Sequence, residues 1–322
     1  PKTMCGIIGY IGKKSASPIL LEGLRRLEYR GYDSAGVAII DTADVSIRKK
    51  KGKIDEGLAR LVLESPLTGS TGIGHTRWAT HGAPTDENSH PHFDQSGRIG
   101  IVHNGVIENY DQLKERLMAS GHTFRSATDT EVLAHLIGEQ YEKQKDRNGD
   151  SIHPLTEAVM NALREVIGTY GIGVVCSDHP GILVGARRGS PLIVGVGDGE
   201  NFLTSDTSAV VAHTRQVIYL NDYDVITLTS DRFTVNSLGT DSAKVQISQL
   251  EFGAEASEKG DFPHYMLKEI FEQPRTVENA MRGRLDKEEV TAKFGGLNLS
   301  TAALRAIDQI VIVACGTSWH AA

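Results

Sequence analysis

Cys5-Gly6-Ile7-Ile8-Gly9-Tyr10-Ile11 stands almost at the start of this 322-residue chain, as a cysteine followed by a strand-like apolar run. A cysteine at a mature N-terminus carries a nucleophile and a base on one residue, because an α-amine with a pKa of about 8 is partly unprotonated at neutral pH. The segments His75-Thr76-Arg77-Trp78 and His103-Asn104-Gly105 add polar groups at the ends of further strand-like runs. We therefore predict that Cys5 is a nucleophile at a mature N-terminus.

The composition is that of a globular protein with a sizeable core, since 39% of the residues are hydrophobic. Asp and Glu number 41 against 34 Lys and Arg, a formal net charge of −7, so no general basic field attracts nucleic acid or anionic lipid. The basic cluster Arg48-Lys49-Lys50-Lys51 is interpreted as solvated charge at a strand end. We find no cleavable signal and no apolar run of the roughly 20 residues that a membrane span needs. We expect a cytoplasmic protein without a membrane or nucleic-acid partner.

The cysteines and histidines do not form a metal-binding pattern. Cys5, Cys176 and Cys315 are an odd number spread along the chain, which predicts neither a disulfide framework nor paired zinc ligands. Histidines are frequent between residues 75 and 103, and neutral imidazoles suit zinc. Their spacing matches none of the strong zinc motifs, so we expect no metal ion.

Apolar spacing and end signals predict three helices in the first half of the chain. They cover residues 18–29, 109–121 and 128–142. In the first, Ser17 suits the N-cap and Pro18 the first helical position. The third begins with Thr128-Asp129-Thr130-Glu131, which has the spacing of a capping box.

Short β-rich segments occupy much of the remaining sequence. They cover residues 6–11, 36–40, 72–78, 99–103, 171–177, 182–187, 192–197, 217–220 and 224–229. Turn residues separate many of them closely enough for antiparallel hairpins, and the helices come in blocks, not after every strand. The sequence therefore predicts an α+β fold in which helices are layered on antiparallel sheets.

The character of the chain changes near residue 251. Residues 255–261 are polar and charged, a helical stretch follows from Pro263, and a strand is expected over 310–314. We expect one domain over residues 5–250, a linker over 251–262 and the beginning of a second domain over 263–322. Because the sequence stops soon after the last of these strands, we interpret it as part of a longer protein.

Attack of a thiolate on a carboxamide needs donors for the developing oxyanion and groups that hold the rest of the substrate. Asn104 and Gly105 are a candidate oxyanion hole, but Asn-Gly is also the favoured two-residue hairpin turn. Arg77 is placed to clamp a carboxylate, or is a surface arginine packed on Trp78. Asp129 is a candidate acceptor for an ammonium group, or only complements the dipole of the helix that it begins.

Five motifs together resemble the glutamine–fructose-6-phosphate aminotransferase family of class II glutamine amidotransferases. They are Cys5-Gly6-Ile7, Arg30-Gly31-Tyr32-Asp33-Ser34-Ala35-Gly36, His75-Thr76-Arg77-Trp78-Ala79-Thr80-His81-Gly82, His90-Pro91-His92 and His103-Asn104-Gly105. Cys-Gly-Ile is common to all class II amidotransferases, whereas the Arg30 segment and Thr80-His81-Gly82 point to this family. The run from Lys259 to Met266 resembles the family's entry into its isomerase domain.

The resemblance implies an N-terminal-nucleophile fold, a four-layer αββα sandwich of antiparallel sheets, followed by the truncated start of an α/β sugar-isomerase domain. It implies that Cys5 is the nucleophile, with its freed α-amine acting as base through water, and that Asn104 and Gly105 form the oxyanion hole. It implies that Arg77 binds the α-carboxylate of glutamine and that Asp129 binds its α-ammonium group, with His81 nearby. It also implies that Trp78 is a gate on the path of ammonia and that Arg30 lies near the Cys5 amine.

For the complete enzyme the resemblance implies hydrolysis of L-glutamine, internal transfer of ammonia, and conversion of fructose 6-phosphate to glucosamine 6-phosphate without a metal or organic cofactor. Thr317 and Ser318 match the start of the sugar-phosphate pocket, where hydroxyl groups and a helix N-terminus favour an anion. The complete enzyme is expected to be a homodimer, formed largely through the isomerase domain, and this chain a monomer.

Two departures from the family pattern bear on activity. Pro1-Lys2-Thr3-Met4 precedes Cys5, so in the sequence as it stands the amine of Cys5 is part of a peptide bond. Either Met4 is the initiator or a short leader is removed, and we expect little glutaminase activity while these residues are attached. Most of the isomerase domain also lies beyond Ala322, so we expect that this chain does not make glucosamine 6-phosphate.

Two other functions are compatible with the motifs. One is that of another class II amidotransferase, such as one that supplies purine synthesis, although the segment after Lys259 argues against it. The other is that of a catalytically silent module that binds glutamine, which differs from an enzyme in releasing no glutamate.

Overall fold

The computed structural model describes residues 5–31, 33–41, 44–78, 82–145, 152–239, 245–250, 260, 262–281, 285–286, 291–292, 300–313 and 319–320. The chain divides after residue 254 into two compact units, each described here by itself. No helix among the described residues is both long enough and apolar enough to span a membrane.

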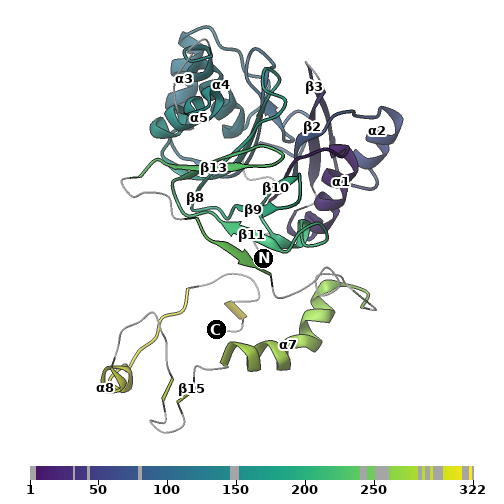
Figure 1. Ribbon diagram of the computed structural model, residues 1–322. Coiled ribbons are helices and arrows are strands. Elements are labelled where there is room, and N and C mark those ends of the chain that lie inside the picture. Colours follow the sequence, from purple (N-terminus) through teal and green to yellow (C-terminus); the bar gives the residue numbers. More distant parts are fainter. Residues whose placement is uncertain are drawn as a thin grey trace. The chain divides into compact units, whose positions relative to one another are not determined.

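Two antiparallel sheets form the centre of the first unit (Figure 1). The eight-stranded sheet has the order β14-β11-β9-β10-β1-β4-β2-β3, and the six-stranded sheet the order β13-β12-β8-β7-β6-β5. The strands of the first are β1 (Gly6–Ile11), β2 (Ser34–Asp41), β3 (Asp44–Lys51), β4 (Thr71–Arg77), β9 (Ile193–Val196), β10 (Asn201–Thr204), β11 (Gln216–Tyr219) and β14 (Ile247–Gln249). Those of the second are β5 (His92–Phe93), β6 (Ile99–Ile107), β7 (Gly168–Cys176), β8 (Leu183–Arg188), β12 (Asp224–Leu228) and β13 (Phe233–Ser237).

Helices cover the outer face of each sheet. Figure 1 shows α1 (Ala16–Leu27) and α2 (Leu58–Glu64) beside the first strands of the eight-stranded sheet. It shows α3 (Tyr110–Ala119), α4 (Asp129–Glu142) and α5 (Pro154–Glu165) grouped beside the six-stranded sheet. Separate buried apolar clusters join each sheet to its helices, and a third cluster joins the sheets to each other. The predicted αββα layering is confirmed.

The alternation of side chains along β1 explains why this strand lies at the centre of the sandwich. Ile7 and Ile11 belong to the cluster between the two sheets, whereas Ile8 and Tyr10 pack in the cluster under α1 and α2. Successive residues of a strand point to opposite faces of the sheet, so a strand that is covered on both faces needs apolar side chains on both. β1 pairs on one side with β10 and on the other with β4, and all of its residues are buried.

The helix predicted over 18–29 begins two residues earlier, at Ala16, with Ser15 at its N-cap. The assignment of Ser17 to the N-cap is therefore wrong. Pro18 still lies in the first turn of this helix, where a backbone N–H has no acceptor within the helix, so the N–H that proline lacks costs no hydrogen bond. The other two helices are confirmed, with Thr128 accepting a hydrogen bond from the Glu131 N–H.

Several elements escaped the sequence analysis. They are α2, α5, β3, β5, β10, β13 and β14. The Arg48–Lys51 cluster forms the end of β3, as predicted, but it is not solvated throughout, because Lys49 is half-buried. Lys49 Nζ donates to the carbonyl oxygens of Glu87 at 3.0 Å and Ser89 at 2.8 Å. The cluster therefore contributes an internal anchor for the segment after β4.

The second unit contains α7 (Tyr265–Met281), the short pair β15 (Leu285–Asp286) and β16 (Thr291–Ala292), and α8 (Thr301–Arg305). α7 confirms the helical stretch predicted after residue 263. The strand predicted over 310–314 is wrong for its described part, because Ile310–Val313 pairs with no strand that the structure describes and is exposed. Apolar, β-branched sequence alone does not make a strand without a neighbour to accept its hydrogen bonds.

Four histidines are buried where the eight-stranded sheet meets β5, β6 and the start of α4. They are His75, His90, His92 and His103, each at most 6% exposed. The rings of His75 and His90 stack with centroids 4.1 Å apart, and His90 meets His92 edge-on. Burial lowers the pKa of His75 to about 3, and it lowers the pKa values of His90 and His92 well below 6.5. The rings of His75, His90 and His92 are therefore neutral at physiological pH.

We predict that the protein loses stability as the pH falls from 7 to 5. In this range the buried imidazoles bind protons in the unfolded chain, where the histidine pKa is near 6.5, but not in the folded chain. Their contribution to the free energy of unfolding is therefore complete above pH 6.5 and is lost as the pH falls toward 3. His75 alone accounts for about 2 kcal/mol between pH 7 and 5. Urea unfolding at pH 7, 6 and 5 measures this effect. An unfolding free energy that stays constant over this range would contradict it.

Candidate active site

Cys5 lies immediately before β1, opposite the end of β4. The pairing of β1 with β4 sets Gly6 against Thr76, so Cys5 reaches the end of β4 at Arg77 and Trp78. The Trp78 N–H donates to Cys5 Sγ at 3.2 Å, and the thiol lies 3.5 Å from the Trp78 carbonyl oxygen. The pairing of β1 with β4 thus holds the Cys5 sulfur at the end of the eight-stranded sheet.

Burial raises the pKa of the Cys5 thiol, although the hydrogen bond from the Trp78 backbone lowers it in part. Asp33 raises it further and Arg77 opposes this effect. The sulfur is therefore a neutral thiol at physiological pH. A base must accept its proton before or during any attack on a substrate.

Asn104 approaches Cys5 from the other sheet. Its Nδ2 donates to the Cys5 carbonyl oxygen at 3.1 Å, while its Oδ1 lies 3.0 Å from His75 Nε2. β6 runs on to Ile107, so Asn104 and Gly105 lie within a strand, opposite Gly171 and Tyr170 of β7. Both the hairpin-turn interpretation and the strand end predicted at His103 are wrong. The sandwich has brought a strand amide to the candidate nucleophile.

Gly105 has a backbone conformation that other residues rarely adopt. Its φ is +133°, and a Cβ at this position would lie 2.1 Å from the Thr169 carbonyl oxygen. A strand residue with positive φ is strained unless it is glycine. The Asn-Gly pair that resembles a turn in sequence is thus an irregularity inside a long strand.

Arg77 is the last residue of β4 and is almost completely buried. Its two terminal nitrogens donate to the carbonyl oxygens of Ala83 and Gly82, both at 3.2 Å. Burial lowers its pKa, and Asp33, Cys5 and Asp129 act against this effect. The surface-arginine interpretation is therefore wrong, and a buried cation lies within electrostatic reach of the thiol.

Asp129 is the first residue of α4 and is 5% exposed. Its Oδ2 accepts from the Ile107 N–H at 2.9 Å, which ties the end of β6 to the start of α4. The structure thus places this carboxylate beside the strand that carries Asn104.

Arg30 pairs with Asp206 at 2.7 Å and is 9% exposed. The neighbouring Ser205 accepts from the Ile7 N–H through its hydroxyl at 2.9 Å, so this ion pair belongs to the layer that supports β1. Trp78 is 37% exposed beside the thiol. His81, Thr317 and Ser318 lie outside the described residues.

Hydrogen-bond partners assign one tautomer to three of the buried histidines. His75 Nε2 and His103 Nε2 face the backbone carbonyl oxygens of His103 and Thr169, so both nitrogens carry a proton. His90 Nδ1 accepts from the His103 N–H, which puts its proton on Nε2, toward the Thr130 hydroxyl. The sequence analysis weighed these histidines only as metal ligands. The described residues contain no group of three or more His, Cys, Asp or Glu arranged to hold a metal ion.

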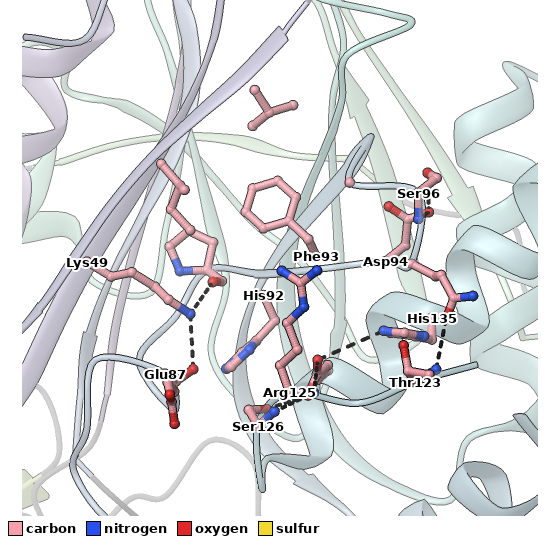
Figure 2. Close-up of a pocket in the computed structure, with 16 residues that line it drawn as sticks. Lys49, Glu87, His92, Phe93, Asp94, Ser96, Thr123, Arg125, Ser126 and His135 are labelled. Carbon is pink, nitrogen blue, oxygen red and sulfur yellow. Dashed lines mark hydrogen bonds and ion pairs between the residues drawn. The ribbon is translucent and has the colours of Figure 1, made fainter. Parts of the chain in front are cut away.

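A pocket of about 500 Å³ has His92 of the histidine cluster in its lining (Figure 2). β3, the segment from Pro91 to Gly97, the segment from Thr123 to Ser126 and α4 provide its lining, which does not include Cys5, Arg77 or Asn104. In Figure 2, Lys49 and Arg125 reach into this pocket from different elements. Glu131 accepts from the Arg125 and Ser126 N–H groups at 2.9 and 2.6 Å. The pocket is thus distinct from the Cys5 site.

Comparison with known proteins agrees with this geometry. A family profile described as a glutamine amidotransferase domain matches residues 65–149. Glutamine–fructose-6-phosphate aminotransferase (isomerizing) from Thermus thermophilus is 50% identical over 318 residues, which are 99% of this chain and 50% of the relative. The protein of that name from Chlorobaculum tepidum is 48% identical over 320 residues, which are 99% of this chain and 51% of the relative. The chain spans about half the length of the curated relatives it matches.

Solved structures support the fold. Glutamine phosphoribosylpyrophosphate amidotransferase from B. subtilis, complexed with ADP and GMP, superimposes with a TM-score of 0.60 at 25% identity. The match covers 74% of this chain and 50% of that protein. With the sandwich, the Cys5–Asn104 contact and the sequence identities taken together, the chain is homologous over 99% of its length to glutamine–fructose-6-phosphate aminotransferases and contains a glutamine amidotransferase domain.

Proposed function

We propose that the first unit hydrolyses L-glutamine to glutamate and ammonia, with Cys5 as nucleophile. The observation that carries this proposal is the contact between Asn104 Nδ2 and the Cys5 carbonyl oxygen at 3.1 Å. It brings an amide donor from one sheet to the cysteine of the other, beside the thiol that an acyl transfer needs. Membership of an amidotransferase family supports glutamine as the substrate.

In the proposed reaction, Cys5 Sγ attacks the side-chain carbonyl carbon of glutamine. The thiol proton passes through water to the free α-amine of Cys5 and then to the departing nitrogen, which leaves as ammonia. Water next hydrolyses the thioester, releasing glutamate and restoring the thiol. Asn104 Nδ2 has a second N–H besides the one given to the Cys5 carbonyl. That N–H and the Gly105 backbone N–H are the proposed donors to the oxyanion.

The buried charges suit the two ends of an amino acid. Arg77 is a cation at the end of β4, and Asp129 is a carboxylate at the start of α4, beside the end of β6. We therefore assign Arg77 to the α-carboxylate and Asp129 to the α-ammonium. Trp78, whose backbone holds the sulfur, is the proposed gate, with His81 nearby. Arg30 is the proposed neighbour of the nucleophile's amine.

For the whole protein we propose amination of fructose 6-phosphate to glucosamine 6-phosphate with ammonia from this site. This proposal rests on identities of 50% and 48% to proteins named for that aminotransferase. Its domains are 5–250 for glutamine hydrolysis, a linker over 251–262, and the start of a sugar-isomerase domain over 263–322, with Thr317 and Ser318 at its sugar-phosphate pocket. We further propose a cytoplasmic enzyme that is a homodimer through its isomerase domain.

The proposed base predicts that activity depends on the residue before Cys5. In a chain that begins at Cys5 the amine is free, whereas in one that begins at Pro1 the bond to Met4 removes its basicity. We expect glutamate release from glutamine only by the former, and the Cys5→Ala variant is the control for contaminating glutaminase. Equal activity of the two chains would show that another group is the base.

The proposed oxyanion hole predicts a loss of turnover in Asn104→Ala. Loss of one such donor costs on the order of 100- to 1000-fold in kcat, with KM little changed, because the interaction is made mainly in the transition state. Asn161→Ala on α5 is a matched control that should retain activity. Glutaminase activity of Asn104→Ala within a few-fold of the parent would refute this assignment.

A further inference from the structure

The amide of Asn104 has two possible orientations, and only one of them serves the oxyanion hole. With Nδ2 toward Cys5 it donates to the Cys5 carbonyl and to a developing oxyanion. After a rotation of half a turn, Oδ1 would face both oxygens, which would replace a donor by a repulsive acceptor. Some neighbouring group must therefore select the productive orientation.

His75 makes this selection. Its Nε2 lies 3.1 Å from the His103 carbonyl oxygen, which can only accept, so Nε2 carries the proton. The same nitrogen lies 3.0 Å from the side-chain amide of Asn104. An N–H faces an oxygen there and not a second donor, so the amide is held with Oδ1 toward His75 and Nδ2 toward Cys5.

The surroundings of His75 hold the ring in this tautomer and position. The ring is completely buried in the middle of β4, which pairs with β1 and β2, and it stacks on His90. Its Nδ1 is buried without a hydrogen-bond partner in the part of the chain that the structure describes. A proton on Nδ1 would leave a buried donor unpaired and turn the Nε2 lone pair toward two oxygens. Moving the proton therefore loses both hydrogen bonds.

A supporting contact anchors the ring on which His75 stacks. Lys49 Nζ donates to the carbonyl oxygens of Ser89 and Pro91, on either side of His90, at 2.8 and 3.4 Å. His90 Nδ1 in turn accepts from the His103 N–H at 3.3 Å. The segment that carries His90 is thus fixed to β3 on one side and β6 on the other, so the stacking surface under His75 is rigid.

We infer that His75 is a positioning residue for glutamine hydrolysis, which orients the Asn104 amide through Nε2–H so that Nδ2 faces the nucleophile. This inference rests on the oxyanion role proposed for Asn104. It goes beyond that role because it has His75 act through Asn104, which its Nε2 contacts, and gives it no direct contact with the reacting atoms. It assigns a function to a buried histidine whose second nitrogen has no hydrogen-bond partner among the described residues.

The test is a double-mutant cycle in the chain that hydrolyses glutamine. His75→Leu should reduce kcat by no more than Asn104→Ala does, with KM little changed. Adding His75→Leu to Asn104→Ala should cost no further activity, because the residue through which His75 acts is already absent. Independent, multiplicative losses would overturn the inference. If Asn104→Ala alone is fully active, the proposed oxyanion hole fails, which is a different outcome.

A pair of conservative variants separates positioning from packing. Glutamine places its Nε2 the same number of bonds from Cα as the histidine Nε2, so His75→Gln should retain activity within a few-fold. His75→Asn, whose amide is one bond shorter, should fall toward the level of Asn104→Ala. Equal activities of these two variants would overturn the inference even if His75→Leu does not fold. His179→Leu, remote from Cys5, is the matched control.

Two further measurements do not require turnover. Alkylation of Cys5 by iodoacetamide uses no oxyanion hole, so its rate should be unchanged in His75→Gln and His75→Asn if only the Asn104 orientation is affected. Long-range proton–nitrogen NMR correlations of the His75 ring should show the Nε2–H tautomer at pH 7. Detection of the Nδ1–H tautomer would overturn the inference whatever the kinetics.

Discussion

The hydrogen bond from Asn104 to Cys5 connects two sheets that share no strand, and the rest of the candidate site depends on it. Its length is set by the packing of the sheets' inner faces, where Ile7 and Ile73 of one meet Val102 and Val175 of the other. Protein interiors are closely packed and resist small displacements. The sandwich core therefore controls the geometry at the nucleophile, although none of its apolar side chains takes part in chemistry.

Buried polar groups complete this control because each has a defined donor and acceptor role. The rings of His75, His90 and His103 are held by backbone groups whose roles cannot reverse. The Thr130 hydroxyl can both donate and accept, which lets it join His90 to His103. Burial keeps His75 and His90 neutral, so this arrangement persists over the physiological pH range. The histidines whose spacing argued against a metal site in the sequence form a hydrogen-bonded scaffold in the structure.

The limits of the sequence analysis are clearest at His103-Asn104-Gly105. Local propensity favoured a hairpin turn, since Asn-Gly is the commonest such pair. Tertiary pairing with β7 instead extends β6 through both residues, and the positive φ of Gly105 is accommodated within the strand. α2 and α5 were missed although α5 has Pro154 at its first turn and His153 as its N-cap. At the other extreme, apolar Ile310–Val313 predicted a strand that has no described partner.

The sequence by itself determined the elements whose signals are local, namely β1 with its two apolar faces, the capped start of α4, and the antiparallel α+β class. Its motifs also identified Cys5, Arg77, Asn104 and Asp129 as the polar residues of interest. Only the tertiary structure decided which of them meet, because Cys5 and Asn104 are 99 residues apart and lie on different sheets. It also decided that His75 faces the Asn104 amide, since sequence periodicity gives the face of a strand but not the atom that lies opposite.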